Sequence, residues 1–247
     1  MIKIGGKKAQ YYKGILMKAD LGLHEQIARE VIRREPPTHQ PKILDLGAGE
    51  GALSQRLHDL GYSVIAADMD ESNYKCENAY FHKIDFNNTE EILQFTTQYT
   101  DYFDVVLGIE VIEHVENPWE YIRLLKKMVR PGGTIIVTTP NITSWLSRLI
   151  FLLSGQFHQF HDKDLSYGHI APITKWELEV ILRKENLEDI FFQPGGYLPL
   201  IWVQRSFKYM LLNAVGIVLR LIMRGQRDGW CIIASCRKMR NESSGSK

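Results

Sequence analysis

The residues with the clearest chemical potential form a glycine-rich segment, Asp45 to Gly51 (DLGAGEG), between an apolar β-branched run and a helical pattern. Glycines at such a junction let the backbone turn tightly and approach a ligand without a Cβ in the way. The helix that follows directs its N-terminal amides towards that ligand. Asp68 ends the next apolar run, where a carboxylate can accept hydrogen bonds from two ribose hydroxyls. The segment therefore predicts a site for a nucleoside-bearing cofactor.

Two classes of cofactor fit this segment. Gly47, Gly49 and Ala52, with Asp68 as acidic partner, satisfy the fingerprint of NAD-dependent oxidoreductases. In contrast, Asp45 places an acid two residues before the first glycine, beside the expected position of a cationic methionine group. The third glycine completes the pattern D-x-G-x-G-x-G, which favours the methionine-derived cofactor and leaves the oxidoreductase as an alternative.

A second chemical cluster is the segment Glu110-Val111-Ile112-Glu113-His114. If a helix begins here, Glu110, Glu113 and His114 share one face. Two carboxylates and an imidazole can hold a divalent cation and leave coordination positions open. His169 is a fourth candidate ligand. Without a metal, His114 is a candidate general base or a packing residue.

Short apolar runs alternate with helical patterns around these segments. We expect strands at 42–46, 63–67, 81–84, 103–107 and 134–138, and helices near 20–35, 51–60, 89–99 and 117–129. Such alternation predicts a mostly parallel sheet with helices on both faces. Further along, 145–153 and 174–186 read as helices, the second with Thr174 as N-cap and Glu177 in a capping box. We expect 188–192 and 230–236 to be the final strands.

These segments resemble, in order, the motifs of class I S-adenosylmethionine-dependent methyltransferases. The matching elements are DLGAGEG, the acids Asp68 and Asp85, VLGIEVIEHV and RPGGTIIVTTPN, and they cover residues 40–141. The sequence is most similar to the branch of ubiquinone-biosynthesis O-methyltransferases and related bacterial small-molecule methyltransferases. The resemblance implies a Rossmann-like α/β fold, with a seven-stranded, mostly parallel sheet, an antiparallel last strand and a helical insertion before it.

The resemblance also implies which residues bind S-adenosyl-L-methionine. Asp68 would hold the ribose, with Asp70 as second choice, and Asp85 with Phe86 would meet the adenine. The full expected set is Asp45, Gly47, Ala48, Gly49, Gly51, Asp68, Met69, Asp85, Phe86, Ile109 and Glu110.

A metal site follows from a related resemblance. RNA 3′-terminal 2′-O-methyltransferases bind a magnesium-like ion through an E-x-x-E-H segment and a later histidine. By this likeness Glu110, Glu113, His114 and His169 would bind Mg²⁺ or another divalent cation, which would lower the pKa of an acceptor hydroxyl. His114 and Glu113 are then the expected catalytic residues.

The favoured function is methylation of a hydroxyl on a small or amphiphilic acceptor. The N/D-P-P-Y/F signature of many base-methylating enzymes does not occur at this position, which argues against exocyclic base nitrogens. Alternatives are an RNA 3′-terminal 2′-O-methyltransferase and a non-catalytic, cofactor-binding partner subunit. Thirty basic and twenty-nine acidic residues give a net charge of +1, so nucleic acid is the less favoured partner.

We expect residues 1–240 to form a single methyltransferase domain, followed by a disordered tail at 241–247. Within it, 1–36 would be an N-terminal helical cap and 40–141 the cofactor-binding core. Residues 142–187 and 197–227 would be the specificity region. The three cysteines lack metal-binding spacing, and the N-terminus lacks an apolar signal run, so we expect a cytoplasmic protein. We expect it to be a monomer or a homodimer.

Two segments of the specificity region invite separate interpretations. His158, His161, Asp162 and Asp164 read as a mobile, solvated lid rather than a second metal site. In 197–227 the longest uncharged stretch is too short to span a bilayer. The basic residues predicted to ring an apolar helical hairpin are Arg205, Lys208, Arg220, Arg224 and Arg227. This hairpin would cover the acceptor pocket, form a dimer contact or touch a membrane peripherally.

Overall fold

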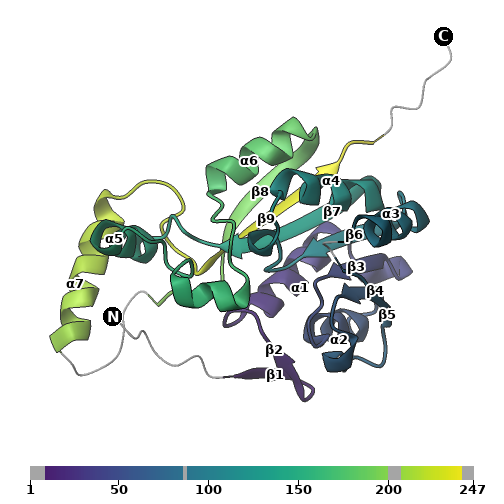
Figure 1. The fold of residues 1–247 in the computed structure, drawn as a ribbon, viewed down its shortest axis with the longest axis horizontal. Coiled ribbons are helices and arrows are strands. Elements are labelled where there is room, and N and C mark those ends of the chain that lie inside the picture. The colour runs from purple at the N-terminus through teal and green to yellow at the C-terminus, as the bar shows by residue number, and fades with distance from the viewer. Residues whose placement is uncertain (1–8, 86–87, 200–206, 241–247) are drawn as a thin grey trace, which may run out of the picture.

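The computed structural model describes residues 9–85, 88–199 and 207–240, which contain a central seven-stranded sheet (Figure 1). Its order is β5-β4-β3-β6-β7-β9-β8. The strands are β3 (Lys42–Leu46), β4 (Ser63–Asp68), β5 (Tyr80–Lys83), β6 (Phe103–Gly108), β7 (Val129–Pro140), β8 (Leu187–Gly195) and β9 (Cys231–Lys238). Neighbouring strands run parallel except at β9, which is antiparallel to both β7 and β8. The predicted fold, including the antiparallel last strand, is confirmed.

Helices cover both faces of this sheet because its central strands are apolar on both sides. Ile43 of β3 packs with α1 (Leu23–Arg34) and α2 (Ala52–Asp59) on one face. Leu44, the next residue, packs on the other face with α3 (Thr89–Gln98), α4 (Pro118–Met128) and α6 (Lys175–Lys184). The helices expected near 20–35, 51–60, 89–99, 117–129 and 174–186 are therefore all present.

Side-chain caps define where several helices begin. The side chains of Asn88, Asn117 and Ser144 accept hydrogen bonds from backbone amides at the starts of α3, α4 and α5 (Trp145–Ser154). Thr174 Oγ1 accepts from the Glu177 amide at 3.0 Å, which confirms the predicted N-cap. Short 3₁₀ helices lie at η1 (Pro37–His39), η2 (Glu71–Asn73), η3 (Ile112–His114) and η4 (Asp162–Tyr167).

The N-terminal region is not the purely helical cap that its sequence predicted. Strands β1 (Gln10–Tyr12) and β2 (Ile15–Met17) form an antiparallel hairpin before α1. Lys13 and Gly14 both have positive φ, 48° and 83°, which suits a two-residue hairpin turn. Lysine is unusual in such a turn, so the sequence carried no clear hairpin signal.

The 197–227 segment holds one described helix rather than the predicted hairpin. Helix α7 (Phe207–Ile222) packs against α5, and a Cβ on Gly216 would lie only 3.0 Å from the Trp145 ring. Arg220 is largely buried: it donates to Asp228 at 2.7 Å and lies over the Trp145 ring. It therefore does not belong to an exposed basic ring, while Arg205 and the side chain of Lys208 lie outside the described residues.

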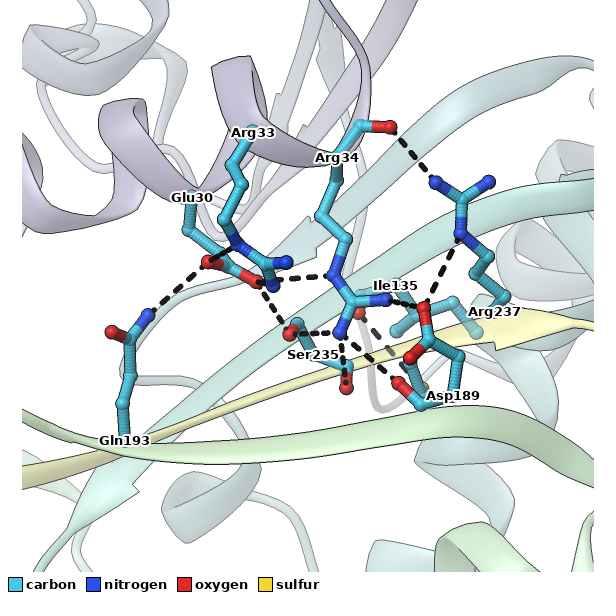
Figure 2. A network of polar contacts seen from close by, with 9 residues as sticks. Glu30, Arg33, Arg34, Ile135, Asp189, Gln193, Ser235 and Arg237 are labelled. Carbon is cyan, nitrogen blue, oxygen red and sulfur yellow. Dashed lines mark hydrogen bonds and ion pairs between the residues drawn. The ribbon is translucent and has the colours of Figure 1, made fainter.

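A buried polar network joins α1 to the last two strands (Figure 2). Glu30 and Arg34 form an ion pair with both side chains almost fully buried. Arg34 also donates to the Ser235 hydroxyl at 2.8 Å and to the carboxylate of Asp189, and Ser235 donates to Glu30 at 2.6 Å. Burial alone would raise the pKa of Glu30, but hydrogen bonds from Arg33, Ser235 and Arg34 outweigh it and leave that pKa lowered. The network is therefore charged.

Replacing Arg34 by alanine should lower the free energy of unfolding by about 3–5 kcal/mol, because Glu30 then stays buried with fewer charged partners. The matched control is Arg183→Ala, which breaks an exposed ion pair to Glu179 at the same helical spacing. That loss should be at most about 0.5 kcal/mol. Urea unfolding followed by circular dichroism measures both. Similar small losses in the two variants would show that the network does not carry this stability.

Candidate active site

A cavity of about 1090 Å³ opens at the carboxyl ends of β3 and β6. The loop after β3 and residues Ile109 and Glu110 after β6 form its floor. The other walls come from three parts of the chain. These are residues 16–21 with His24, side chains between 158 and 169, and the group Tyr197, Pro199 and Trp230. Open α/β sheets bind ligands in this position. The volume is at the upper end of the range that holds drug-sized ligands, which leaves room for a cofactor and a second molecule.

The three glycines of the loop serve different purposes. All have positive φ. A Cβ on Gly47 would collide with Val111 at 2.3 Å, while one on Gly49 would meet nothing within 4 Å. The open space over Gly49 belongs to the cavity, which Gly47, Ala48 and Gly49 line. Gly51 instead packs against Tyr74, where a Cβ would approach to 2.7 Å. Gly51 thus has a packing role beneath the loop, and its contact with the cofactor stays a prediction.

Asp45 is buried at the cavity floor. The Ser54 hydroxyl donates to its carboxylate at 2.6 Å. Burial raises the pKa of Asp45 to about 6; the Ser54 hydrogen bond opposes this rise and the charge of Asp68 adds to it. A cation beside such a buried acid stabilises its ionised form. This matches the role that the sequence assigned to Asp45.

Asp68 lies where the sequence predicted, at the end of β4, but its observed role is to hold the loop. Its Oδ2 accepts from the Gly49 amide at 2.8 Å. Met69 beside it is exposed, and Asp85 follows β5. None of these three is among the residues that line the cavity in the described part of the chain. Phe86 lies outside the described residues.

The segment after β6 does not form the helix expected from Glu110. Glu110 has a positive φ of 57°, its amide donates to Thr138 on β7 at 2.8 Å, and only Ile112–His114 make a short 3₁₀ helix. The turn leaves Glu110 outside the group in which ligand atoms of Glu113, His114 and His169 lie within 4.8 Å of one another, although the charge of Glu110 still raises the pKa of Glu113. The helical face that Glu110, Glu113 and His114 were expected to share does not exist.

Glu110 instead joins Asp20 and Cys231, with potential ligand atoms within 4.8 Å of one another. The Cys231 thiol contacts Asp20 at 2.9 Å, and burial, followed by the charges of Glu110 and Asp20, raises the pKa of that thiol well above its usual value. No sequence motif marks Asp20, which lies shortly before α1. It was missed for that reason, as was His24, a buried cavity residue whose pKa burial lowers to about 4.

The structure does bring Glu113, His114 and His169 together, again with ligand atoms within 4.8 Å. Glu113 is fully buried, and neither carboxylate oxygen has a hydrogen-bond partner among the described residues. The Ile170 and Ala171 amides both donate to the Glu113 carbonyl at 3.0 Å, which ties the 158–171 segment to the end of β6. Three of the four predicted metal ligands thus converge.

Both imidazoles of this group face the cavity. The His114 and His169 rings meet edge to face at 4.9 Å. Nδ1 of His169 contacts the Gln159 carbonyl at 2.9 Å, which assigns the proton to Nδ1 and leaves the lone pair on Nε2. Burial, with His169 as second cause, lowers the pKa of His114. His114 can therefore act as a neutral donor of a lone pair, and Nε2 of His169 is the ring nitrogen not engaged by the Gln159 carbonyl.

The segment predicted as a solvated lid forms a wall of the cavity. It contains the 3₁₀ helix η4, capped by contacts between His161 and Asp164. His158 packs edge to face on Trp230 at 4.7 Å, and burial lowers its pKa to about 4. His158 and His161 are therefore bound into the structure by packing and capping, which corrects the view of this stretch as lacking regular structure.

Replacing Asp45 by asparagine should stabilise the protein. A raised folded-state pKa means that ionising Asp45 opposes folding, so this cost is complete above pH 6 and disappears as the pH falls below 3.8. At pH 8 the variant should gain up to about 3 kcal/mol, and roughly half of that gain at pH 5. Unfolding in urea at both pH values checks this. A variant less stable than wild type at pH 8, or a pH-independent difference, contradicts the assignment.

Comparison with known proteins matches this geometry. A family model described as a methyltransferase domain fits residues 20–190. The chain is 34% identical to the ubiquinone biosynthesis O-methyltransferase of Rhizobium etli over 207 residues, 78% of this chain and 82% of the relative. It is 35% identical to the protein of the same name from Ruegeria pomeroyi over 184 residues, 72% of this chain and 73% of the relative.

A solved structure gives the same answer for the fold. A SAM-dependent methyltransferase from Archaeoglobus fulgidus matches 87% of this chain and 94% of its own, with a TM-score of 0.58 and 20% identity. The family match begins at Asp20, includes the glycine loop and the Glu113 group, and ends in β8. With the cavity at the carboxyl ends of its parallel strands, the chain belongs to the S-adenosylmethionine-dependent methyltransferases.

Proposed function

We propose that the protein methylates a hydroxyl oxygen of a small or amphiphilic acceptor, with a divalent cation held by Glu113, His114 and His169. The observation that carries this proposal is a buried carboxyl group without hydrogen-bond partners beside two imidazoles on the cavity wall. The two curated relatives, both named as O-methyltransferases, support an oxygen acceptor.

The cavity divides naturally between the two reactants. Residues 40–141 would hold the cofactor, with its cationic end in the cavity over Asp45 and Gly49. Its ribose and adenine would extend beyond the cavity lining, towards Asp68 and towards Asp85 and Phe86. Residues 142–187 and 197–227 would surround the acceptor, since their side chains form the opposite wall. The acceptor hydroxyl would then lie near His114 and His169.

The donor set constrains the cation. With Glu110 in a separate cluster, one carboxylate and two imidazoles remain. Such a set favours Mn²⁺ or Zn²⁺ over Mg²⁺, which prefers oxygen ligands. A bound cation would lower the pKa of the acceptor hydroxyl and fix its orientation.

The chain's own residues have definite tasks in this reaction. The acceptor oxygen bonds to the methyl carbon as the carbon–sulfur bond breaks, and positioning the two in line supplies much of the rate. Neutral His114 accepts the hydroxyl proton when no cation is bound. The wall formed by His158 and η4 limits access of water from one side.

Asp68→Ala should weaken binding of S-adenosylhomocysteine about tenfold or more, because a charged acceptor for the ribose and the anchor of the Gly49 amide are both lost. Asp70→Ala is the matched control, since Asp70 is a neighbouring carboxylate that caps η2. Calorimetric titration of the metal-stripped protein measures both, with NAD⁺ as a negative ligand. A larger loss in Asp70→Ala would move the ribose contact to that residue.

Glu113→Gln should abolish retention of Mn²⁺ or Zn²⁺ in equilibrium dialysis, because an amide is a much weaker metal ligand than a carboxylate. Glu110→Gln should retain the cation, since Glu110 lies in the other cluster. Unchanged circular dichroism spectra of both variants would confirm that the fold persists. No retention by the wild type, even with S-adenosylhomocysteine and a catechol present, would exclude the metal.

The oxygen acceptor is tested separately with a labelled methyl donor. We expect transfer to a catechol that carries an octyl chain. If the enzyme does not methylate this catechol but methylates a terminal 2′-hydroxyl of RNA, the RNA-directed alternative is favoured instead.

A further inference from the structure

The outward side of α7 is apolar along its whole length. The residues at helical spacing on this side are exposed, and they include Phe207, Met210, Leu211, Ala214, Val218 and Leu221. Phe207 is 81% and Leu221 is 79% exposed. The inward side, with Leu212 and Gly216, packs on α5. A helix that is apolar on its outward side as well as on its packed side is normally covered by something other than water.

The last turn of α5 extends this surface. Phe151, Leu152 and Leu153 are exposed, Leu152 at 80%. Helices α5 and α7 lie together at one end of the molecule, away from the sheet (Figure 1). We call the outward side of α7 together with the last turn of α5 the α5–α7 face. Its size distinguishes it from single exposed leucines, which are common on soluble proteins.

More basic than acidic side chains lie at this face, where Asp228 pairs with Arg220 at 2.7 Å and with Arg227 at 3.7 Å. Neither helix contains an aspartate or glutamate. Arg224 and Arg227 are exposed just beyond the end of α7, and Arg148 of α5 donates to the Arg224 carbonyl. In a self-complementary dimer, like charges would tend to meet, whereas an anionic lipid surface neutralises them. The charges therefore favour lipid over a second copy of the chain.

The α5–α7 face is joined to the cavity by shared residues. Tyr197 and Pro199 line the cavity, while Leu198 between them packs with Trp145 and Leu212 under the face. Trp230 contributes to both. A surface that binds this face would therefore lie close to the cavity wall assigned to the acceptor.

We propose that the α5–α7 face docks the protein on an anionic lipid bilayer, with the apolar side chains in the interface and Arg224 and Arg227 at the headgroups. No helix in the described ranges is long and apolar enough to cross a membrane. The proposed contact is peripheral, with α7 lying in the interfacial plane. The inference goes beyond the methyl-transfer reaction and does not depend on which atom is methylated.

Co-sedimentation of the full chain with vesicles tests this docking. Wild type should bind vesicles of phosphatidylcholine mixed with phosphatidylglycerol, and bind pure phosphatidylcholine less. Leu221→Glu should reduce partition about tenfold or more, because a charge replaces a leucine that the proposed contact would bury in the lipid interface. Arg224→Glu should reduce binding to the anionic vesicles about fivefold or more and leave binding to pure phosphatidylcholine less affected.

The matched control is Leu93→Glu, since Leu93 is 60% exposed on α3, far along the chain from this face. It should bind vesicles as wild type does. Circular dichroism and S-adenosylhomocysteine titration identify any variant that fails to fold, and Val218→Glu then replaces it. Absence of wild-type binding, or equal losses in Leu93→Glu, would overturn the proposal. So would a dimer that Leu221→Glu dissociates without any vesicle binding, which would assign the face to a second copy.

Discussion

The buried contact between Glu30, Arg34 and Ser235 is the interaction on which most of this structure depends. It fixes α1 across the antiparallel end of the sheet (Figure 2). His24 in the first turn of α1 and Asp20 just before this helix both line the cavity. The same arginine binds Asp189, whose positive φ of 49° lies at the register shift in β8. Because the charges are buried, any displacement of α1 would leave one of them without a partner. The network therefore fixes the position of a cavity wall to which it contributes no side chain.

The cavity and its surroundings contain acidic side chains whose burial costs free energy. Asp45 and Glu113 are buried with raised pKa values, and Glu110 shares its surroundings with Asp20 and a thiol. Ionisation of Asp45 or of Glu113 raises the free energy of the folded chain, and both carboxylates are stabilised when positive charge enters. A sulfonium cofactor brings such charge, as does a divalent cation. Stability and function oppose each other at these positions, as is usual for active sites.

The sequence predicted the fold closely because its strands, glycine loop and caps are all local signals. Ile43 and Leu44 already show that β3 is covered on both faces. The site was predicted less fully. The placement of Glu110 depends on one positive φ and on a hydrogen bond to Thr138, a residue 28 positions away. The position of Asp20 in the cavity wall depends on how the Glu30–Arg34–Ser235 network holds α1 against the sheet. Neither feature leaves a periodic or compositional trace, whereas Glu113, His114 and His169 were found because a family motif records them.

The position of β9 also has a consequence for how the chain assembles. This strand lies between β7 and β8, yet it is the last of the seven to be synthesised. Until it is made, the inner edges of β7 and β8 expose unpaired backbone groups, and Ser235 is missing from the network around Arg34. A nascent chain at this stage holds a half-finished sheet with open, apolar edges, which is the form most prone to pair with other chains. The exposure of these two strand edges therefore ends only when β9 has been synthesised.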